Sequence, residues 1–167
     1  NRAVRGLELL AADDAISRAD FEAIKFDVAY AEDSRAAHYV RRVQDETFEA
    51  DSRYAEGQDV LARWNLETDL GNEQAALGVC VLSAEWLAEQ QRRPAPPVRE
   101  VFVDCVDRMT EQLGRLEVPW GEVNRLRRGR VDLPLAGGPD TLRAIYGRDA
   151  DGDGVLTAVG GDGLVVL

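Results

Sequence analysis

Apolar side chains recur every three or four residues through the first two-thirds of the chain. This spacing places them on one face of a helix, so it predicts a series of α-helices rather than strands. The clearest case is residues 98–113, where the apolar positions stay on one side throughout. The pattern predicts helices over residues 3–12, 17–31, 34–43, 48–66, 73–91 and 98–113.

Residues that favour helix ends separate these segments. Ser17 and Asp20 have the spacing of a capping box, in which each side chain bonds to the backbone amide of the other residue. Gly71–Asn72 is expected to end one helix and cap the next. Residues 94–97 end the helix before them, because proline supplies no backbone donor and restricts the residue that precedes it. Gly114 is expected to stop the last long helix.

The pattern changes after Leu116, where glycine and proline become frequent. Residues 122–128 are expected to form one or two helical turns. Residues 142–146 and 155–159 flank a Gly/Asp turn, which predicts a β-hairpin. Residues 163–167 begin another strand that the sequence cuts off, and a truncated strand would leave an open sheet edge. This ending favours a fragment of a larger fold.

We therefore expect one structural unit of mainly α class with two regions. Residues 1–116 form a helical region. Residues 117–167 form a Gly/Pro-rich segment with a short helix and a hairpin, which lead to the truncated core strand. Apolar residues make up 45% of the chain, enough for a real core.

The charge balance excludes some partners. The chain has 20 basic and 31 acidic residues and a net charge of -11. Such a surface repels phosphate backbones and anionic membranes, so we expect neither nucleic acid nor a membrane as a partner. No run of 18 apolar residues and no signal-like segment is present in the sequence. The chain begins at Asn1, and we expect a processed or trimmed polypeptide.

Cys80 and Cys105 are the two cysteines of the chain. A zinc site needs more ligands at short spacing, so these residues do not predict one. Two buried free thiols are the favoured interpretation. A disulfide between adjacent helices is the alternative if the protein is exported.

Asp149, Asp151 and Asp153, followed by Gly154, match the opening of an EF-hand loop. Calcium coordination needs a bidentate acid at the twelfth position of that loop, which here is Gly160. The flanking segments also have strand character, whereas an EF-hand needs helices. We therefore expect a polar hairpin turn, with no metal and no cofactor bound.

No catalytic constellation is evident in the sequence. His38 is the single histidine, and no Gly-x-Ser-x-Gly elbow accompanies it, so a structural histidine on a helix is expected. Trp64, Trp86 and Trp120 are expected to be core anchors. Gly137–Pro139 has no following Lys-Ser/Thr, and it is typical of a turn rather than a phosphate loop.

Arg125, Arg127, Arg128 and Arg130 form the densest basic cluster of this acidic chain. Guanidinium groups could clamp a carboxylate or a phosphate bidentately. The excess of acidic residues favours pairing within the chain instead.

The segment from Pro119 to Arg143 carries a resemblance to a known family. It contains the runs PWGEVNRLRRG and VDLPLAGGPDTLR. Residues 160–163 look like the glycine-rich entry to a late core strand of the same family. Weaker support comes from residues 1–3 and 7–10 and from residues 62–69. These segments resemble the C-terminal part of the larger (β) chain of the penicillin-amidase-like acylases. The likeness is greatest to the aculeacin and acyl-homoserine-lactone acylases.

The resemblance implies an N-terminal nucleophile hydrolase with an αββα core. Such a precursor cleaves itself, and the new N-terminal Ser of the larger chain is the nucleophile. Its own α-amine is the base, because that group has a pKa of about 8 and lies beside the hydroxyl. Backbone amides and an Asn side chain stabilise the oxyanion. By position in the family all of these groups precede Asn1, so no catalytic residue is expected in this chain.

The function expected from the resemblance is that of an acylase fragment. The intact enzyme would hydrolyse amide-linked acyl groups of the penicillin, lipopeptide or acyl-homoserine-lactone type. Its partners would be the remaining α and β segments of the same precursor and a small acyl-amide substrate. The resemblance also implies a periplasmic or secreted location, and the isolated chain should be inactive. The alternative is a self-sufficient helical binding or scaffold module without catalysis.

Overall fold

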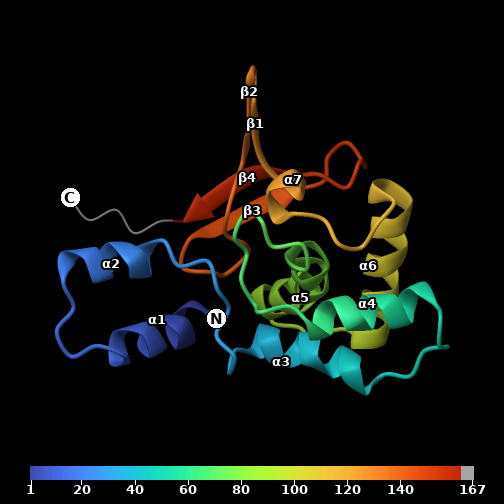
Figure 1. Ribbon diagram of the computed structural model, residues 1–167, viewed down its shortest axis with the longest axis horizontal. Helices are drawn as coiled ribbons and strands as arrows, with labels where there is room; N and C mark the ends of the chain where they lie inside the picture. The colour runs from blue at the N-terminus through green and yellow to red at the C-terminus, as the bar shows by residue number, and fades with distance from the viewer. Residues whose placement is uncertain (163–167) are drawn as a thin grey trace.

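The computed structural model describes residues 1–162, which form seven α-helices, one short 3-10 helix and a four-stranded sheet at one side of the helices (Figure 1). The helices are α1 (Arg2–Ala11), α2 (Arg18–Lys25), α3 (Arg35–Arg41), η1 (Arg42–Asp45), α4 (Arg53–Ala62), α5 (Ala75–Gln90), α6 (Val98–Leu113) and α7 (Trp120–Val123). The strands are β1 (Asn124–Arg128), β2 (Val131–Pro134), β3 (Ala144–Arg148) and β4 (Leu156–Asp162). The predicted strand at residues 163–167 lies outside the described residues.

Side chains predicted to start or stop helices do so. Ser17 and Asp20 form the capping box at the start of α2. The Asn72 Oδ1 atom accepts a hydrogen bond from the Ala75 amide at 2.9 Å, at the start of α5. Gly114 follows α6 with φ of 70°, a left-handed conformation that glycine adopts without steric cost. Local sequence therefore fixes these helix ends.

Two helices are shorter than the spacing predicts. The helix expected over residues 17–31 ends at Lys25, because the following segment pairs with residues 66–68 instead. The Tyr30 amide donates to Leu66 O at 2.9 Å, and the Thr68 amide donates to Val28 O at 3.2 Å. The helix expected over residues 48–66 is confined to α4.

The sheet is larger than the predicted hairpin, so the fold is mixed α/β rather than mainly α. Its strand order is β2-β1-β4-β3, in which β3 and β4 form the predicted antiparallel hairpin. The prediction of helical turns over residues 122–128 is wrong, because α7 ends at Val123 and the chain continues as β1. Strand β1 pairs with β4 in parallel, with Asn124 opposite Leu156, and it pairs with β2 in a second hairpin. That hairpin projects away from the helices in Figure 1.

The core lies among the helices and the loops that join them, with α5 packed against α3, α4 and α6. Gly78 on α5 lets the Trp64 ring approach closely, since a Cβ atom there would lie 2.3 Å from the Trp64 ring. The most completely buried apolar side chains are those of Trp120, Phe102, Leu77, Leu82, Val43, Val60, Val81, Val106 and Val118.

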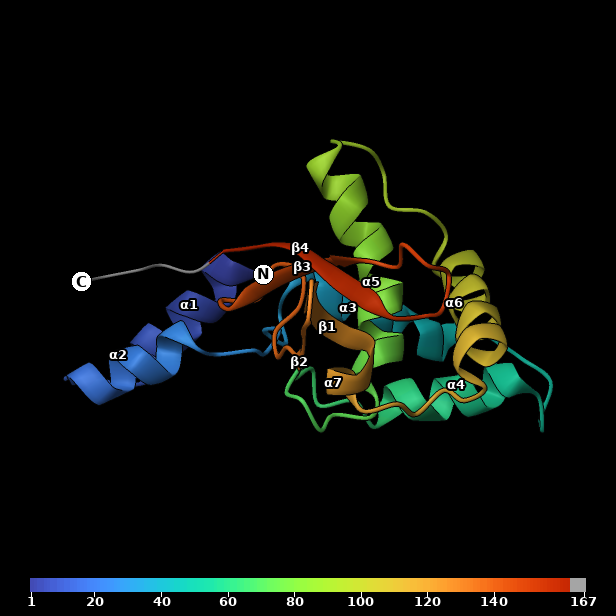
Figure 2. The same cartoon turned by 90° about the horizontal axis from the view of Figure 1, so that it is seen from above.

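Helices α1 and α2 lie outside this core. Figure 1 and Figure 2 both place them at one end of the molecule, while α4 and α6 lie at the other. Neither helix contains a buried residue. We call α1 and α2, with the residues that join them, the N-terminal arm (residues 2–25). Within the described residues, no helix combines the length and apolar character that a membrane crossing requires.

Candidate functional site

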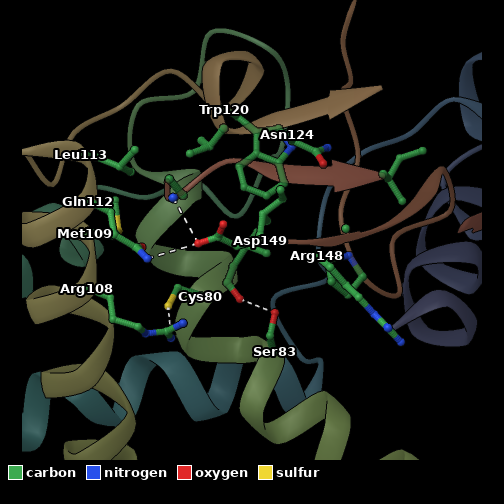
Figure 3. A pocket seen from close by; sticks show the side chains of 18 residues that line it. Cys80, Ser83, Arg108, Met109, Gln112, Leu113, Trp120, Asn124, Arg148 and Asp149 are labelled. Atoms are coloured by element: carbon green, nitrogen blue, oxygen red, sulfur yellow. Dashed lines mark hydrogen bonds between the residues drawn. The ribbon is translucent and has the colours of Figure 1, made fainter. Parts of the chain in front are cut away.

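An open cleft of about 480 Å³ lies between α5, α6 and the sheet, a size typical of small-molecule sites. Figure 3 shows α5 and α6 forming its helical walls, with Trp120 and Asn124 on the side of the sheet. The apolar side chains that line it are those of Ala76, Val79, Met109, Leu113, Val123, Ile145 and Leu156. The polar side chains include those of Ser83, Arg108, Gln112, Asn124, Arg148 and Asp149.

Trp120 and Asn124 fix the sheet side of the cleft. Each is only 1% exposed. The Trp120 indole Nε1 donates to Gly137 O at 2.9 Å. The Asn124 amide Nδ2 donates to the same oxygen at 3.1 Å and to Leu135 O at 2.9 Å. Two buried side chains therefore hold the loop around Gly137, where φ is 97°, against the start of β1.

Asp149 organises the turn at the rim of the cleft. One carboxylate oxygen accepts from the Gly152 amide at 2.7 Å, and the other accepts from the Gly154 amide at 3.1 Å. Gln112 reaches it from α6, with Nε2 3.2 Å from Oδ2 (Figure 3). The segment is a polar turn between strands, as predicted. Among residues 1–162 no group of His, Cys, Asp and Glu side chains is placed to hold a metal ion.

The prediction of free thiols is wrong. Cys80 on α5 and Cys105 on α6 form a disulfide, and their α carbons lie 6.0 Å apart. The bond is possible because α5 and α6 pack side by side, which the separation of 25 residues in the sequence does not reveal. Arg108 Nη2 lies 3.3 Å from the Cys80 sulfur, and Arg108 Nε pairs with Asp104 Oδ2 at 2.9 Å. The disulfide thus forms part of the wall of the cleft.

Asn1 ties the N-terminal arm to the body. Its carboxamide donates from Nδ2 to Asp140 O at 2.9 Å and accepts at Oδ1 from the Ala31 amide at 2.8 Å. Arg5 on α1 makes a two-point contact with Asp27, with 2.8 Å between Arg5 Nη2 and Asp27 Oδ2. The hydrogen bonds of Asn1 give it a structural role. Its carboxamide is not a nucleophile, so it is not a reactive group.

Tyr30 lies next to Ala31, the partner of Asn1, and it also has a structural role. Its hydroxyl donates to Pro139 O at 2.7 Å. Complete burial raises the pKa of Tyr30 well above 10.0, and the negative charge of Asp140 raises it further. The phenol therefore stays protonated and keeps its hydrogen bond at any ordinary pH.

The serine hydroxyls of the described residues have structural partners, including that of Ser17, which donates to the Asp20 carboxylate at 2.6 Å within the exposed capping box. The hydroxyls of Ser17, Ser34 and Ser52 accept hydrogen bonds at helix starts, and Ser83 Oγ donates to Val79 O at 2.6 Å. His38 lies on helix α3, as predicted, and it is exposed. Both cysteines are oxidised. Among residues 1–162 no serine or threonine hydroxyl is hydrogen-bonded to the histidine.

Two of the three tryptophans are core anchors, as predicted. Trp64 is 7% exposed and Trp120 is 1% exposed. Trp86 departs from the prediction, because it is only half-buried and stacks on Tyr146 of β3 with the ring centroids 5.3 Å apart.

The arginine cluster pairs within the chain, at least for its first two members. Arg125 Nε donates to Asp132 Oδ1 at 2.8 Å, across the β1–β2 hairpin. Arg127 lies between Asp132 and Asp153, 3.6 Å from a carboxylate oxygen of each. The hydrogen bond from Arg125 lowers the pKa of Asp132 below 3.8, and the charge of Arg127 adds to this effect.

This shift makes the β1–β2 hairpin sensitive to acid. Its stabilisation by Asp132 should be complete above pH 3.8 and should be lost as the pH falls through the lower pKa of the folded state. In an NMR titration we expect Asp132 to titrate below 3.8, and Arg125→Met to move the midpoint upward. Arg130→Met is the control, because Arg130 makes no ion pair among the described residues. An equal shift in both variants would contradict the pairing.

A family model described as penicillin amidase matches residues 1–162. A search of curated proteins finds no match for the chain. The matched range includes the arm, the helical core and the sheet.

Proposed function

The chain belongs to the penicillin amidase family, and we propose that it is a fragment of an amide-hydrolysing acylase whose nucleophile lies on another segment of the same precursor. The observation that carries this proposal is the family match over residues 1–162. Membership implies hydrolase activity of the intact enzyme. We infer this location of the nucleophile because no serine or threonine hydroxyl among residues 1–162 is hydrogen-bonded to the histidine.

The chemistry of the proposal requires a hydroxyl beside a free amine. The N-terminal Ser of the partner segment would attack the amide carbon, while its own α-amine accepts the hydroxyl proton. The serine hydroxyls described here are poor candidates. Those at helix starts are engaged with the backbone, and Ser83 has no base beside it.

In this proposal the chain supports and positions the reactive centre. Strand β1 pairs with β4, and the side chains of Trp120 and Asn124 hold the adjoining loop. A rigid sheet of this kind supports a reactive centre more precisely than a loop does. The remaining α and β segments of the precursor would complete the enzyme around it.

We further propose acyl amides of the penicillin, lipopeptide or acyl-homoserine-lactone type as substrates, with the aculeacin and acyl-homoserine-lactone acylases as the nearest branch. The location proposed is periplasmic or secreted. The Cys80–Cys105 disulfide supports this location, because disulfides persist mainly in oxidising compartments.

The test compares the intact acylase with this chain alone. Release of free amine from a panel of phenylacetyl and long-chain acyl amides should require the intact enzyme, and the 167-residue chain should give only the buffer rate. Alanine in place of the processed N-terminal Ser should lower kcat at least about 10³-fold. This Ser is the nucleophile of the proposal, so its loss removes the covalent route.

Ser83→Ala is the matched control within this chain. It removes a serine hydroxyl at the cleft, and we expect turnover to stay within about twofold of the parent. Loss of activity in Ser83→Ala, or turnover by the isolated chain, would place the nucleophile within residues 1–167 and would overturn the proposal.

A further inference from the structure

The two sulfurs of the disulfide between α5 and α6 differ in their access to solvent. Cys80 is half-buried and lines the cleft, whereas Cys105 is 0% exposed and does not line it. Figure 3 shows the Cys80 sulfur on α5, with the Arg108 side chain reaching toward it from α6. A molecule that enters the cleft therefore reaches the Cys80 sulfur first.

Arg108 places a positive charge beside both sulfurs. Its Nη2 atom lies 3.3 Å from the Cys80 sulfur and 3.8 Å from the Cys105 sulfur. Its Nε atom pairs with Asp104 Oδ2 at 2.9 Å, which holds the guanidinium in this position. A disulfide sulfur is only a weak acceptor, whereas a nearby cation stabilises a thiolate. The arrangement therefore favours a state in which one of the two sulfurs carries a negative charge.

The cleft favours a small reagent at this bond. Its volume of about 480 Å³ is that of a small-molecule site. Ala76 and Val79 precede Cys80 on α5 and also line the cleft, as does Met109 on α6. These apolar side chains can pack against the carbon atoms of a bound reagent. Because Cys80 lies in the wall of the cleft, a small molecule reaches its sulfur more easily than a folded protein does.

We propose that the cleft admits a low-molecular-weight thiol that opens the disulfide at Cys80, which makes Cys80 a site of reversible S-thiolation. The reagent loses its proton to solvent, and its thiolate forms a bond to the Cys80 sulfur. The Cys80–Cys105 bond breaks, and its electron pair stays on the Cys105 sulfur as a thiolate beside Arg108. The reagent is thereby oxidised and Cys105 is reduced. Attack of the Cys105 thiolate on Cys80 restores the disulfide and releases the reagent.

Mapping the mixed disulfide in the folded chain tests the site of attack. Cys80 and Cys105 lie in different tryptic peptides, because Arg92 and Arg99 stand between them. The chain is incubated with glutathione, quenched at low pH with maleimide and guanidinium, and digested. We expect glutathione on the Cys80 peptide and maleimide on the Cys105 peptide, with a selectivity of at least about tenfold. In urea, where both sulfurs are accessible, glutathione should appear on both peptides. Equal addition to both peptides of the folded chain, or a preference for Cys105, would overturn the proposal.

Two single-cysteine variants test the same point where the Cys105 thiolate reverses the first step before the quench. Each has one free thiol, which reacts with oxidised glutathione to give a stable mixed disulfide. In Cys105→Ala the Cys80 thiol should react within about threefold of its rate in urea, because it faces the cleft. In Cys80→Ala the buried Cys105 thiol should react at least about tenfold more slowly than in urea. Strong protection of Cys80 in the folded chain would overturn the proposal.

Arg108→Met tests the part that the guanidinium plays. It should slow the opening of the disulfide by glutathione about fivefold, because the departing Cys105 thiolate loses its cation. Arg108→Lys keeps the charge, so its rate should lie between those of the parent and Arg108→Met. Arg18→Met is the matched control, because Arg18 also pairs with an acid four residues further on, Glu22 at 3.1 Å, but on α2. Its rate should equal that of the parent, and in urea all four rates should agree. An unchanged or faster rate in folded Arg108→Met would overturn the role of the guanidinium.

Discussion

Trp120→Ala is expected to lower the free energy of unfolding of the chain by about 4 kcal/mol. The indole is 1% exposed and lines the cleft, so truncation removes apolar burial and leaves a cavity. It also removes the donor to Gly137 O, an oxygen that Asn124 then bonds alone. Urea denaturation followed by circular dichroism measures the loss.

Two variants resolve the origin of this effect. Trp120→Phe keeps an aromatic ring but loses the indole donor, so it should cost clearly less than Trp120→Ala. Trp86→Ala removes a half-buried tryptophan that stacks on Tyr146, and it should cost about 1 kcal/mol. Equal losses for Trp120→Ala and Trp86→Ala would contradict the anchoring role of Trp120.

Removal of the disulfide should have an effect of similar size. The double variant Cys80→Ala/Cys105→Ala is expected to lose about 3 kcal/mol of unfolding free energy, because the cross-link closes a loop between residues 25 apart and restricts the unfolded chain. The measurement is urea denaturation of the parent and the variant, each with and without a reductant.

The reductant supplies the internal control for this prediction. It should destabilise the parent by roughly the same 3 kcal/mol and leave the double variant unchanged. A parent that is insensitive to a reductant in urea, where the bond is accessible, would contradict a stabilising cross-link between α5 and α6.

Helices whose signals are local could be predicted from the sequence. Helix α6 runs from Val98 to Leu113 as expected, because its apolar stripe and the stop at Gly114 both lie within the segment. The failure at residues 26–31 has a different cause. Val28 and Ala31 continue the helical spacing, but the backbone there bonds to residues 66–68, and a local pattern contains no information on that pairing.

Strand β1 is a clearer case in which the local sequence pattern did not predict the structure. Its sequence, Asn124–Arg128, is rich in arginine and has no alternating apolar pattern, so local propensity did not predict a strand. Its conformation depends on β4, which begins at Leu156, and on β2 across a tight turn. Tertiary pairing overrides propensity here. The β3–β4 hairpin could be predicted because its partners are close in the sequence.

The cleft could not be predicted, because its walls come from segments far apart in the chain. Ser83, Arg108 and Asp149 converge only after α5, α6 and the sheet have packed together. The disulfide could not be predicted either, because the number of residues between two cysteines does not determine the distance between them in space. Pairing of Arg125 within the chain could be predicted from the excess of acidic residues, but its partner Asp132 could not, because the β1–β2 hairpin was not predicted.

The hydrogen bonds of Asn1 depend on the order in which the polypeptide is synthesised. Its carboxamide bonds to Ala31 and to Asp140, and the second of these emerges from the ribosome long after the first. Asn1 can therefore form both hydrogen bonds only after Asp140 has been synthesised.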